Sequence, residues 1–165
     1  MIIARLAVVL LLLGSAAVPA AASCTDVAGP KVEWRRCSFD GGDFAKQNLS
    51  GAVLRDTSFG FADLSGADLS GSEAYHAKFL SANLAGARFD GATLTEADFT
   101  RANLAGASFR QADLRRAHLF RATLTGADFS GAQMGGADLL NADLSGALWI
   151  DGKRRCAAGS IGQCN

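Results

Sequence analysis

Proline, histidine and net charge are scarce in this chain. Among its 165 residues are two prolines and two histidines, and 16 basic residues balance 16 acidic ones. A neutral chain lacks the positive field that nucleic-acid binding requires, so we expect no nucleic-acid partner. Long apolar runs are also absent beyond the N-terminus, which excludes a transmembrane bundle and predicts one compact domain.

Catalytic motifs are missing as well. An enzyme needs acid, base or nucleophilic groups that converge in a concave site. The sequence contains no phosphate-cradling motif and no Ser-His-Asp set with credible convergence. We therefore predict a protein that is not an enzyme and that has no catalytic residues and no cofactor.

A five-residue repeat occupies most of the chain. From Phe39 to Trp149 every fifth residue is Leu or Phe, with Ala74, Met134 and Trp149 as the only exceptions among twenty-three positions. A small residue, most often Ala, lies two positions before each large one. This period matches neither the 3.6 residues of a helix turn nor the two-residue alternation of a strand.

The repeat predicts an all-β solenoid. If each quintet forms one side of a square, four quintets close a coil of twenty residues, and the large and small residues both point inward. Residues 37–151 would then build nearly six coils stacked at the β spacing of about 4.8 Å. The frequent Gly two positions after the large residue suits a tight corner.

The repeated motif resembles the pentapeptide repeat family, whose consensus is A(D/N)LXX. It is met by ADLSG at residues 67–71 and by ANLAG at residues 82–86 and 102–106. The resemblance implies a right-handed quadrilateral β-helix, a pentapeptide-repeat solenoid. Some members of this family mimic DNA and bind topoisomerases, but formal charge here is close to zero.

The N-terminal segment predicts export. Residues 1–22 have one Arg, an apolar stretch and a terminal run of three Ala, as in a cleaved secretory signal peptide. The alternatives are an uncleaved anchor or a lipoprotein attached through Cys24. After cleavage we expect no stable membrane insertion, and a periplasmic or secreted protein. Residues 23–36 are then an N-terminal cap, and residues 152–165 a C-terminal cap with a disulfide.

Four cysteines suit an oxidising compartment. The solenoid places Cys37 and Cys156 at opposite ends, whereas bridged Cα atoms lie within about 7 Å. The fold hypothesis therefore predicts one bridge between Cys24 and Cys37 and a second between Cys156 and Cys164. Lipidation of Cys24 remains the alternative to the first bridge.

Residues twenty apart are expected to stack as columns on the outside of the solenoid. One column, Asp56, His76, Glu96 and Arg116, predicts a ladder of charges. Another column contains Lys78, Asp98, His118 and Asp138. A single His on a flat face is insufficient for a metal site, so we predict a surface ladder there and no metal.

One side of the solenoid is predicted as an interaction surface, because several outward residues there are apolar. Two arginines stack on the same corner. The candidate residues are Phe61, Leu80, Phe120, Leu140, Arg101 and Arg121. Whether Ala74, the small residue at an inward position, marks a pocket is left open.

The sequence thus favours a non-catalytic exported scaffold or protein-binding module that presents a rigid, flat β-helix surface. Its expected partner is an unknown envelope protein or a second copy of the chain. The alternative is a DNA-mimicking, topoisomerase-binding protein.

Overall fold

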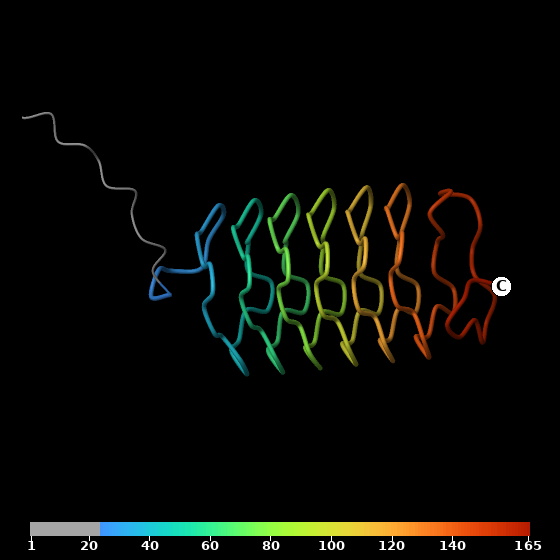
Figure 1. Ribbon diagram of the computed structural model, residues 1–165, viewed down its shortest axis with the longest axis horizontal. Coiled ribbons are helices and arrows are strands. Elements are labelled where there is room, and N and C mark those ends of the chain that lie inside the picture. The colour runs from blue at the N-terminus through green and yellow to red at the C-terminus, as the bar shows by residue number, and fades with distance from the viewer. Residues whose placement is uncertain (1–23) are drawn as a thin grey trace, which may run out of the picture.

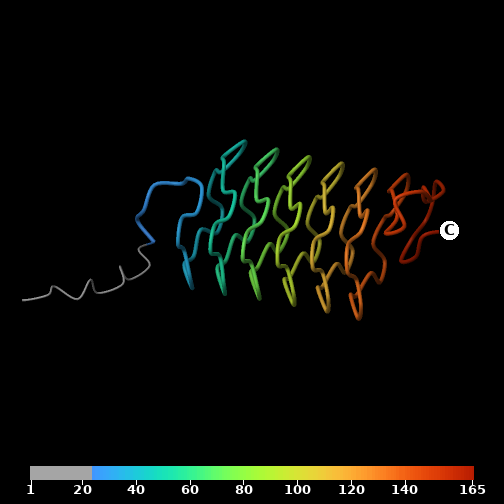
Figure 2. The same cartoon turned by 90° about the horizontal axis from the view of Figure 1, so that it is seen from above.

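The computed structural model describes residues 24–165, so the predicted signal peptide at residues 1–22 lies outside it. The described chain winds into a stack of similar coils that forms an elongated rod (Figure 1), and the view from above shows the same stack (Figure 2). Within residues 24–165 there is no helix and no strand longer than a single bridge residue. Accordingly, no helix in this range is able to cross a membrane.

Parallel β-bridges join residues that are twenty apart in the sequence, which confirms the predicted coil length. The ladder begins with Glu33 paired to Val53 and ends with Asp128 paired to Leu148. It therefore begins inside the segment expected to be the N-terminal cap. At each bridge the backbone bonds to both neighbouring coils: the Lys78 amide donates to the Thr57 carbonyl of the preceding coil at 2.8 Å, and the adjacent Phe79 amide donates to the Asp98 carbonyl of the next coil at 2.7 Å.

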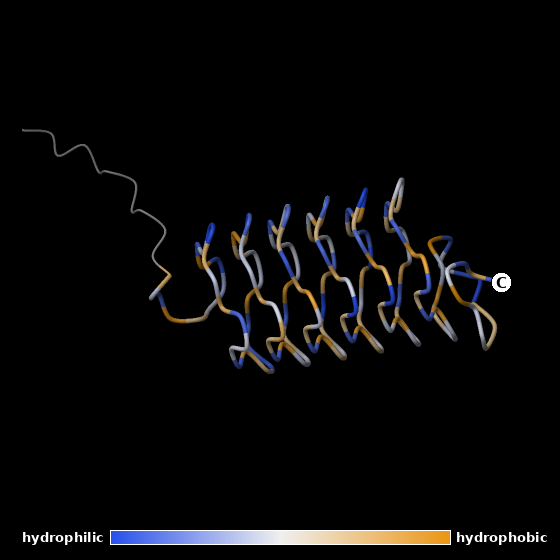
Figure 3. Ribbon diagram, turned by 60° about the horizontal axis from the view of Figure 1, so that its bottom comes forward, coloured by the Kyte–Doolittle hydropathy of each residue, from blue (hydrophilic) through white to orange (hydrophobic). Residues whose placement is uncertain are grey.

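The core is a column of inward Leu and Phe side chains interleaved with Ala. Phe79 and Phe99 stack with ring centroids 4.9 Å apart, and Phe109 stacks on Phe129 at 5.2 Å. These rings are fully buried, as is Ala74. Hydrophobic and hydrophilic residues alternate along each coil (Figure 3), since the bridge residue between each inward pair points outward.

The corners are tight turns in which the large inward residue accepts a hydrogen bond from the amide three residues later, as between Leu104 and Ala107 at 3.0 Å. The third residue of each turn has a positive φ, for example +67° at Gly106. This is the turn position that favours Gly. Several corners carry other residues in the same conformation, among them Phe61 at +59° and His76 at +55°.

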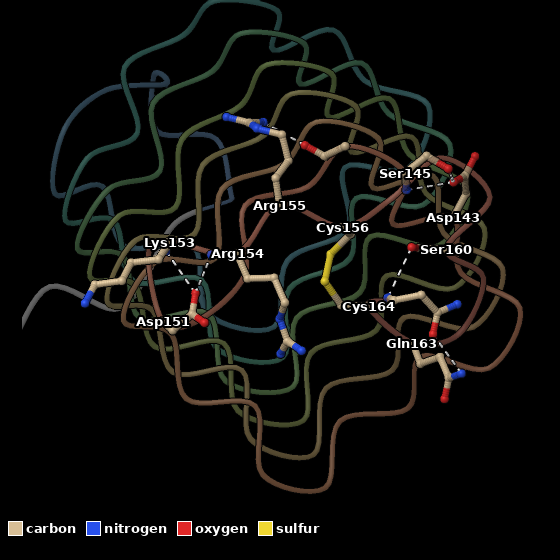
Figure 4. The surroundings of a disulfide bond; sticks show 12 residues. Asp143, Ser145, Asp151, Lys153, Arg154, Arg155, Cys156, Ser160, Gln163 and Cys164 are labelled. Atoms are coloured by element: carbon tan, nitrogen blue, oxygen red, sulfur yellow. Dashed lines mark hydrogen bonds between the residues drawn. A yellow bond between two sulfur atoms is a disulfide. The ribbon is translucent and has the colours of Figure 1, made fainter.

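The two ends of the solenoid are closed differently. At the C-terminal end, residues 152–165 fold back and form antiparallel bridges from Ile161 to Asp143 and from Arg155 to Leu148. Figure 4 shows the Cys156–Cys164 disulfide in this cap, whose Cα atoms are 4.8 Å apart.

At the N-terminal end, Cys24 is bonded to Cys37 with Cα atoms 5.5 Å apart. The buried Trp34 lies against Phe39, with ring centroids 4.4 Å apart, and its carbonyl accepts a hydrogen bond from Thr57. The structure therefore pairs the four cysteines as the sequence predicts.

Candidate interaction surface

All six residues of the predicted surface lie on one corner of the solenoid, where successive coils are joined by backbone hydrogen bonds. The Phe61 amide donates to the Leu80 carbonyl at 2.9 Å. Two coils further on, the Arg101 amide donates to Phe120 at 2.9 Å and the Arg121 amide donates to Leu140 at 3.0 Å. We call this strip the apolar corner; it comprises residues 60–61, 80–81, 100–101, 120–121 and 140–141.

The apolar side chains of this corner differ in exposure. Phe61 is 70% exposed, Leu140 60% and Leu80 37%, whereas Phe120 is half-buried. They form two pairs, Phe61 with Leu80 and Phe120 with Leu140. Because Ser81, Thr100 and Arg101 lie between the pairs, the corner has two apolar patches along its length.

Arg101 and Arg121 differ from the other arginines of residues 37–151. The remaining five, Arg55, Arg88, Arg110, Arg115 and Arg116, each have a carboxylate within 4 Å.

In contrast, neither Arg101 nor Arg121 forms an ion pair with any residue in the described part of the chain. The Arg121 guanidinium lies 5.1 Å from the centroid of the Phe120 ring, which explains the partial burial of that ring. The corner thus presents two unpaired positive charges beside apolar side chains.

A neighbouring corner carries the predicted charge ladder. His76 lies 3.5 Å from Asp56 through Nδ1 and 2.5 Å from Glu96 through Nε2, and Arg116 lies 2.5 Å from the other oxygen of Glu96. The hydrogen bond from His76 lowers the pKa of Glu96, and the positive charge of Arg116 lowers it further. This column is a confirmed ladder of ion pairs between successive coils.

The second predicted ladder is wrong as a set of ion pairs. In the described chain no ion pair within 4 Å joins Lys78, Asp98, His118 or Asp138. Instead the Asp98 carboxylate accepts the Thr100 amide at 2.9 Å, and the Asp138 carboxylate accepts the Leu140 amide at 3.0 Å. Each aspartate is oriented toward its own turn, where an Asx hydrogen bond competes with cross-coil pairing. Residues 24–165 also hold no group of three His, Cys, Asp or Glu able to bind a metal.

The face on the other side of the apolar corner has an amide ladder that our sequence reading missed. The Asn83 amide group donates to Asp63 at 3.1 Å, and the Asn103 amide group donates to Asn83 at 3.2 Å. The twenty-residue spacing of Asp63, Asn83 and Asn103 in the sequence predicts this stacking. Side-chain amides carry no charge, so a pattern of stacked charges does not include them.

Two surface hollows lie along the corner that bears the charge ladder. One, of about 340 Å³, is lined by Arg55, Glu73, Tyr75 and Thr93, and Arg55 lies 2.6 Å from Glu73 within it. Ala74 is fully buried and does not line this hollow.

The other hollow, of about 400 Å³, is lined by Thr95, Arg115, Arg116 and Gly135. Arg115 lies 2.6 Å from Asp113 and Arg116 lies 2.5 Å from Glu96. Both arginines of this hollow are thus engaged with carboxylates of the chain.

The coil architecture matches that of known repeat proteins. The model for pentapeptide repeats matches eight copies in this chain, over residues 35–71, 82–119 and 117–148. Two trypsin-treated variants of QnrB1, a plasmid-mediated fluoroquinolone resistance protein, are each similar in structure with a TM-score of 0.56 and 29% identity. Each match covers 72% of this chain and 63% of QnrB1, so the match spans less than two thirds of QnrB1.

A pentapeptide repeat protein, Rfr23 from the cyanobacterium Cyanothece 51142, is also similar. It has a TM-score of 0.46 and 23% identity over 71% of this chain and 90% of Rfr23. No curated protein sequence matches this chain.

Proposed function

Because this chain belongs to the pentapeptide repeat family, we propose that it is a non-catalytic, exported protein-binding module that presents a rigid surface. The observation that carries the proposal is the apolar corner. Phe61 and Leu140 are 70% and 60% exposed, and the backbone of each is hydrogen-bonded to an adjacent coil, because the Phe61 amide donates to Leu80 and the Leu140 carbonyl accepts from Arg121. A preformed surface of this kind loses little conformational entropy on binding.

Export is the second part of the proposal. Residues 1–22 serve as a cleaved signal peptide, residues 23–36 and 152–165 as caps, and residues 37–151 as a right-handed solenoid of nearly six coils. The two disulfides support a periplasmic or secreted location, because such bonds persist in oxidising compartments. Cys24 is engaged with Cys37, which favours a soluble product over a lipoprotein.

The proposed export is tested by expressing the full-length chain in a Gram-negative host and measuring the intact mass of the product without reducing agent. We expect soluble periplasmic protein that begins near Ser23 and is lighter by four hydrogens than the reduced chain. Uncleaved, reduced protein in the cytoplasm contradicts export.

The binding role is tested by cross-linking the exported protein in the envelope of its own cell and identifying what it captures. We expect a defined partner whose capture is lost in Leu140→Asp, with the melting temperature unchanged. Tyr75→Asp, at a 38% exposed position on a different corner, is the matched control. Capture that survives Leu140→Asp and Phe61→Asp contradicts this surface.

A second candidate function, binding to a topoisomerase by DNA mimicry, is favoured by the likeness to the fluoroquinolone resistance protein QnrB1. Charge argues against it. Removing residues 1–22 removes one of the 16 basic residues, Arg5, and leaves 15 against 16 acidic ones, a net charge of −1. DNA carries one negative charge per about 1.7 Å of helix axis, far more than this rod. Inhibition of a topoisomerase by the purified protein would support this second function over the first.

A further inference from the structure

We propose that the apolar corner binds an acidic polypeptide segment, whose carboxylates lie against Arg101 and Arg121 and whose apolar side chains lie against Phe120 and Leu140. The proposal rests on the protein-binding role and specifies the chemistry of the partner. Its starting point is the contrast between these two arginines and the five others of residues 37–151, all of which are paired.

The two guanidiniums are held in an unfavourable arrangement. Arg101 and Arg121 are twenty residues apart and occupy the same corner of successive coils, where like charges repel. In the described chain neither arginine is compensated by a carboxylate. Local conflicts of this kind concentrate at functional sites.

The surroundings indicate where a partner fits. On one side of the corner lie Asp98, His118 and Asp138, and the two aspartates are oriented toward their own turns. On the other side the column contains the neutral Asn103 and Thr123 beside the two arginines, with Asp63 and Asp143 further along it toward the two ends of the solenoid. An acidic segment therefore meets least repulsion when it crosses the corner at Arg101 and Arg121 toward Asn103 and Thr123.

The same features favour a polypeptide over other anions. Phe120 is half-buried beneath Arg121, and Leu140 is 60% exposed one coil away, so charge and apolar surface adjoin. Nucleic-acid binding draws on several phosphate contacts, about six to ten in well-bound cases, whereas this corner offers two cations. Anionic membranes likewise require clusters of about four to eight basic residues.

The test uses the exported, disulfide-bonded protein labelled with ¹⁵N and a synthetic twelve-residue peptide of Glu-Glu-Leu repeats as the probe. At low salt we expect the amide resonances of Arg101, Phe120, Arg121 and Leu140 to shift as the peptide is added. Peptides of Gln-Gln-Leu and Lys-Lys-Leu should produce no such shifts. No response to the acidic peptide, or an equal response to the neutral one, overturns the proposal.

Variants assign the effect to the two arginines. Arg101→Gln with Arg121→Gln should weaken binding of the acidic peptide by about tenfold, since two exposed pairs of up to about fivefold each contribute at most about 25-fold. Arg88→Gln with Arg110→Gln makes the same change in charge at arginines that are already paired, and should change affinity less than about twofold. An equal loss in both double variants indicates general attraction and overturns the proposal.

Two further probes separate the other anionic partners. Single-stranded DNA or phosphatidylglycerol vesicles that shift the same amide resonances and bind more strongly than the acidic peptide also overturn the proposal. If capture of a partner is lost in Leu140→Asp while the acidic peptide fails to bind, the protein-binding role stands and only the acidic chemistry of the partner is wrong.

Discussion

The Nε2 atom of His76 lies 2.5 Å from a carboxylate oxygen of Glu96, twenty residues further along the chain. The hydrogen bond that it makes lowers the pKa of Glu96 in the folded protein. The pKa of Glu96 is thus lower in the folded than in the unfolded state, where it is about 4.3. Such a carboxyl group stabilises the fold at pH values above its unfolded pKa. This contribution disappears as the pH falls through the folded pKa.

Replacement of Glu96 should therefore reduce the acid sensitivity of the fold. We expect Glu96→Gln to lower the urea midpoint at pH 7 and to lose less stability than the wild type between pH 5 and pH 3. Glu33→Gln is the control, because the Glu33 carboxylate is 4.0 Å from its cation, Arg35. An unchanged pH profile in Glu96→Gln would show that the ladder contributes nothing to folding.

Asp113 should contribute in a lower pH range. Its hydrogen bond from Arg115 lowers its pKa to about 2, and the Arg115 backbone amide also donates to it at 3.1 Å. We expect Asp113→Asn to lower the free energy of unfolding at pH 7 by about 1 kcal/mol, since Arg115 is largely exposed and solvent screens the pair. The difference should vanish as the pH falls from about 4 to 2. Urea unfolding at pH 7 and pH 2 measures both points.

The left-handed corners predict a cost for Gly106→Ala. A Cβ at Gly106 meets no atom within 4 Å, so the cost arises from the positive φ of +67° alone. We expect a loss of about 1 kcal/mol in the free energy of unfolding. Gly135→Ala is the matched control because Gly135 lacks a positive φ, and it should be neutral or stabilising by about 0.5 kcal/mol. Equal effects at both sites would contradict this account.

The aromatic column predicts a large effect at Phe109. Its ring is fully buried between Phe89 and Phe129, with both centroids 5.2 Å away. Phe109→Ala should cost about 3–5 kcal/mol, while Phe109→Leu should cost less because Leu occupies the equivalent position of many coils. Chemical unfolding followed by far-ultraviolet circular dichroism compares the two. A loss under about 1 kcal/mol in Phe109→Ala would indicate that the column is loosely packed.

The C-terminal disulfide should protect the cap. We expect Cys156→Ser with Cys164→Ser to lower stability by about 2–3 kcal/mol, within the range for a small loop. Hydrogen exchange should show the loss first in residues 152–165, leaving the coils near Phe79 protected. If the coils near Phe79 exchange as early as the cap, the cap is not an independent unit.

The inward column and the coil length followed from the sequence because one physical requirement, burial of a large side chain every five residues, acts on every quintet. Phe79, Leu104 and Phe129 are all fully buried for that reason. The same regularity predicted which residues stack, including His76 on Glu96.

The orientation of outward side chains was harder to predict. Asp98 and Asp138 lie in the predicted column but bind their own turns, because a backbone amide two residues later is closer than the next coil. Phe120 was expected to be exposed, yet the guanidinium of Arg121 covers part of it. Outward positions offer several local partners of similar energy, so spacing alone does not select among them.

The twenty-residue coil also sets which insertions and deletions the chain tolerates. Loss of twenty residues removes one coil and leaves every remaining column aligned, whereas loss of five turns all later coils by one side of the square. A five-residue deletion between Ala77 and Glu96 would keep the five-residue spacing of the inward side chains, yet it would place Arg101 beneath His76 in place of Glu96. Such a shift also separates Phe99 from Phe79, so both the aromatic stacks of the core and the charged columns of the surface depend on the twenty-residue spacing.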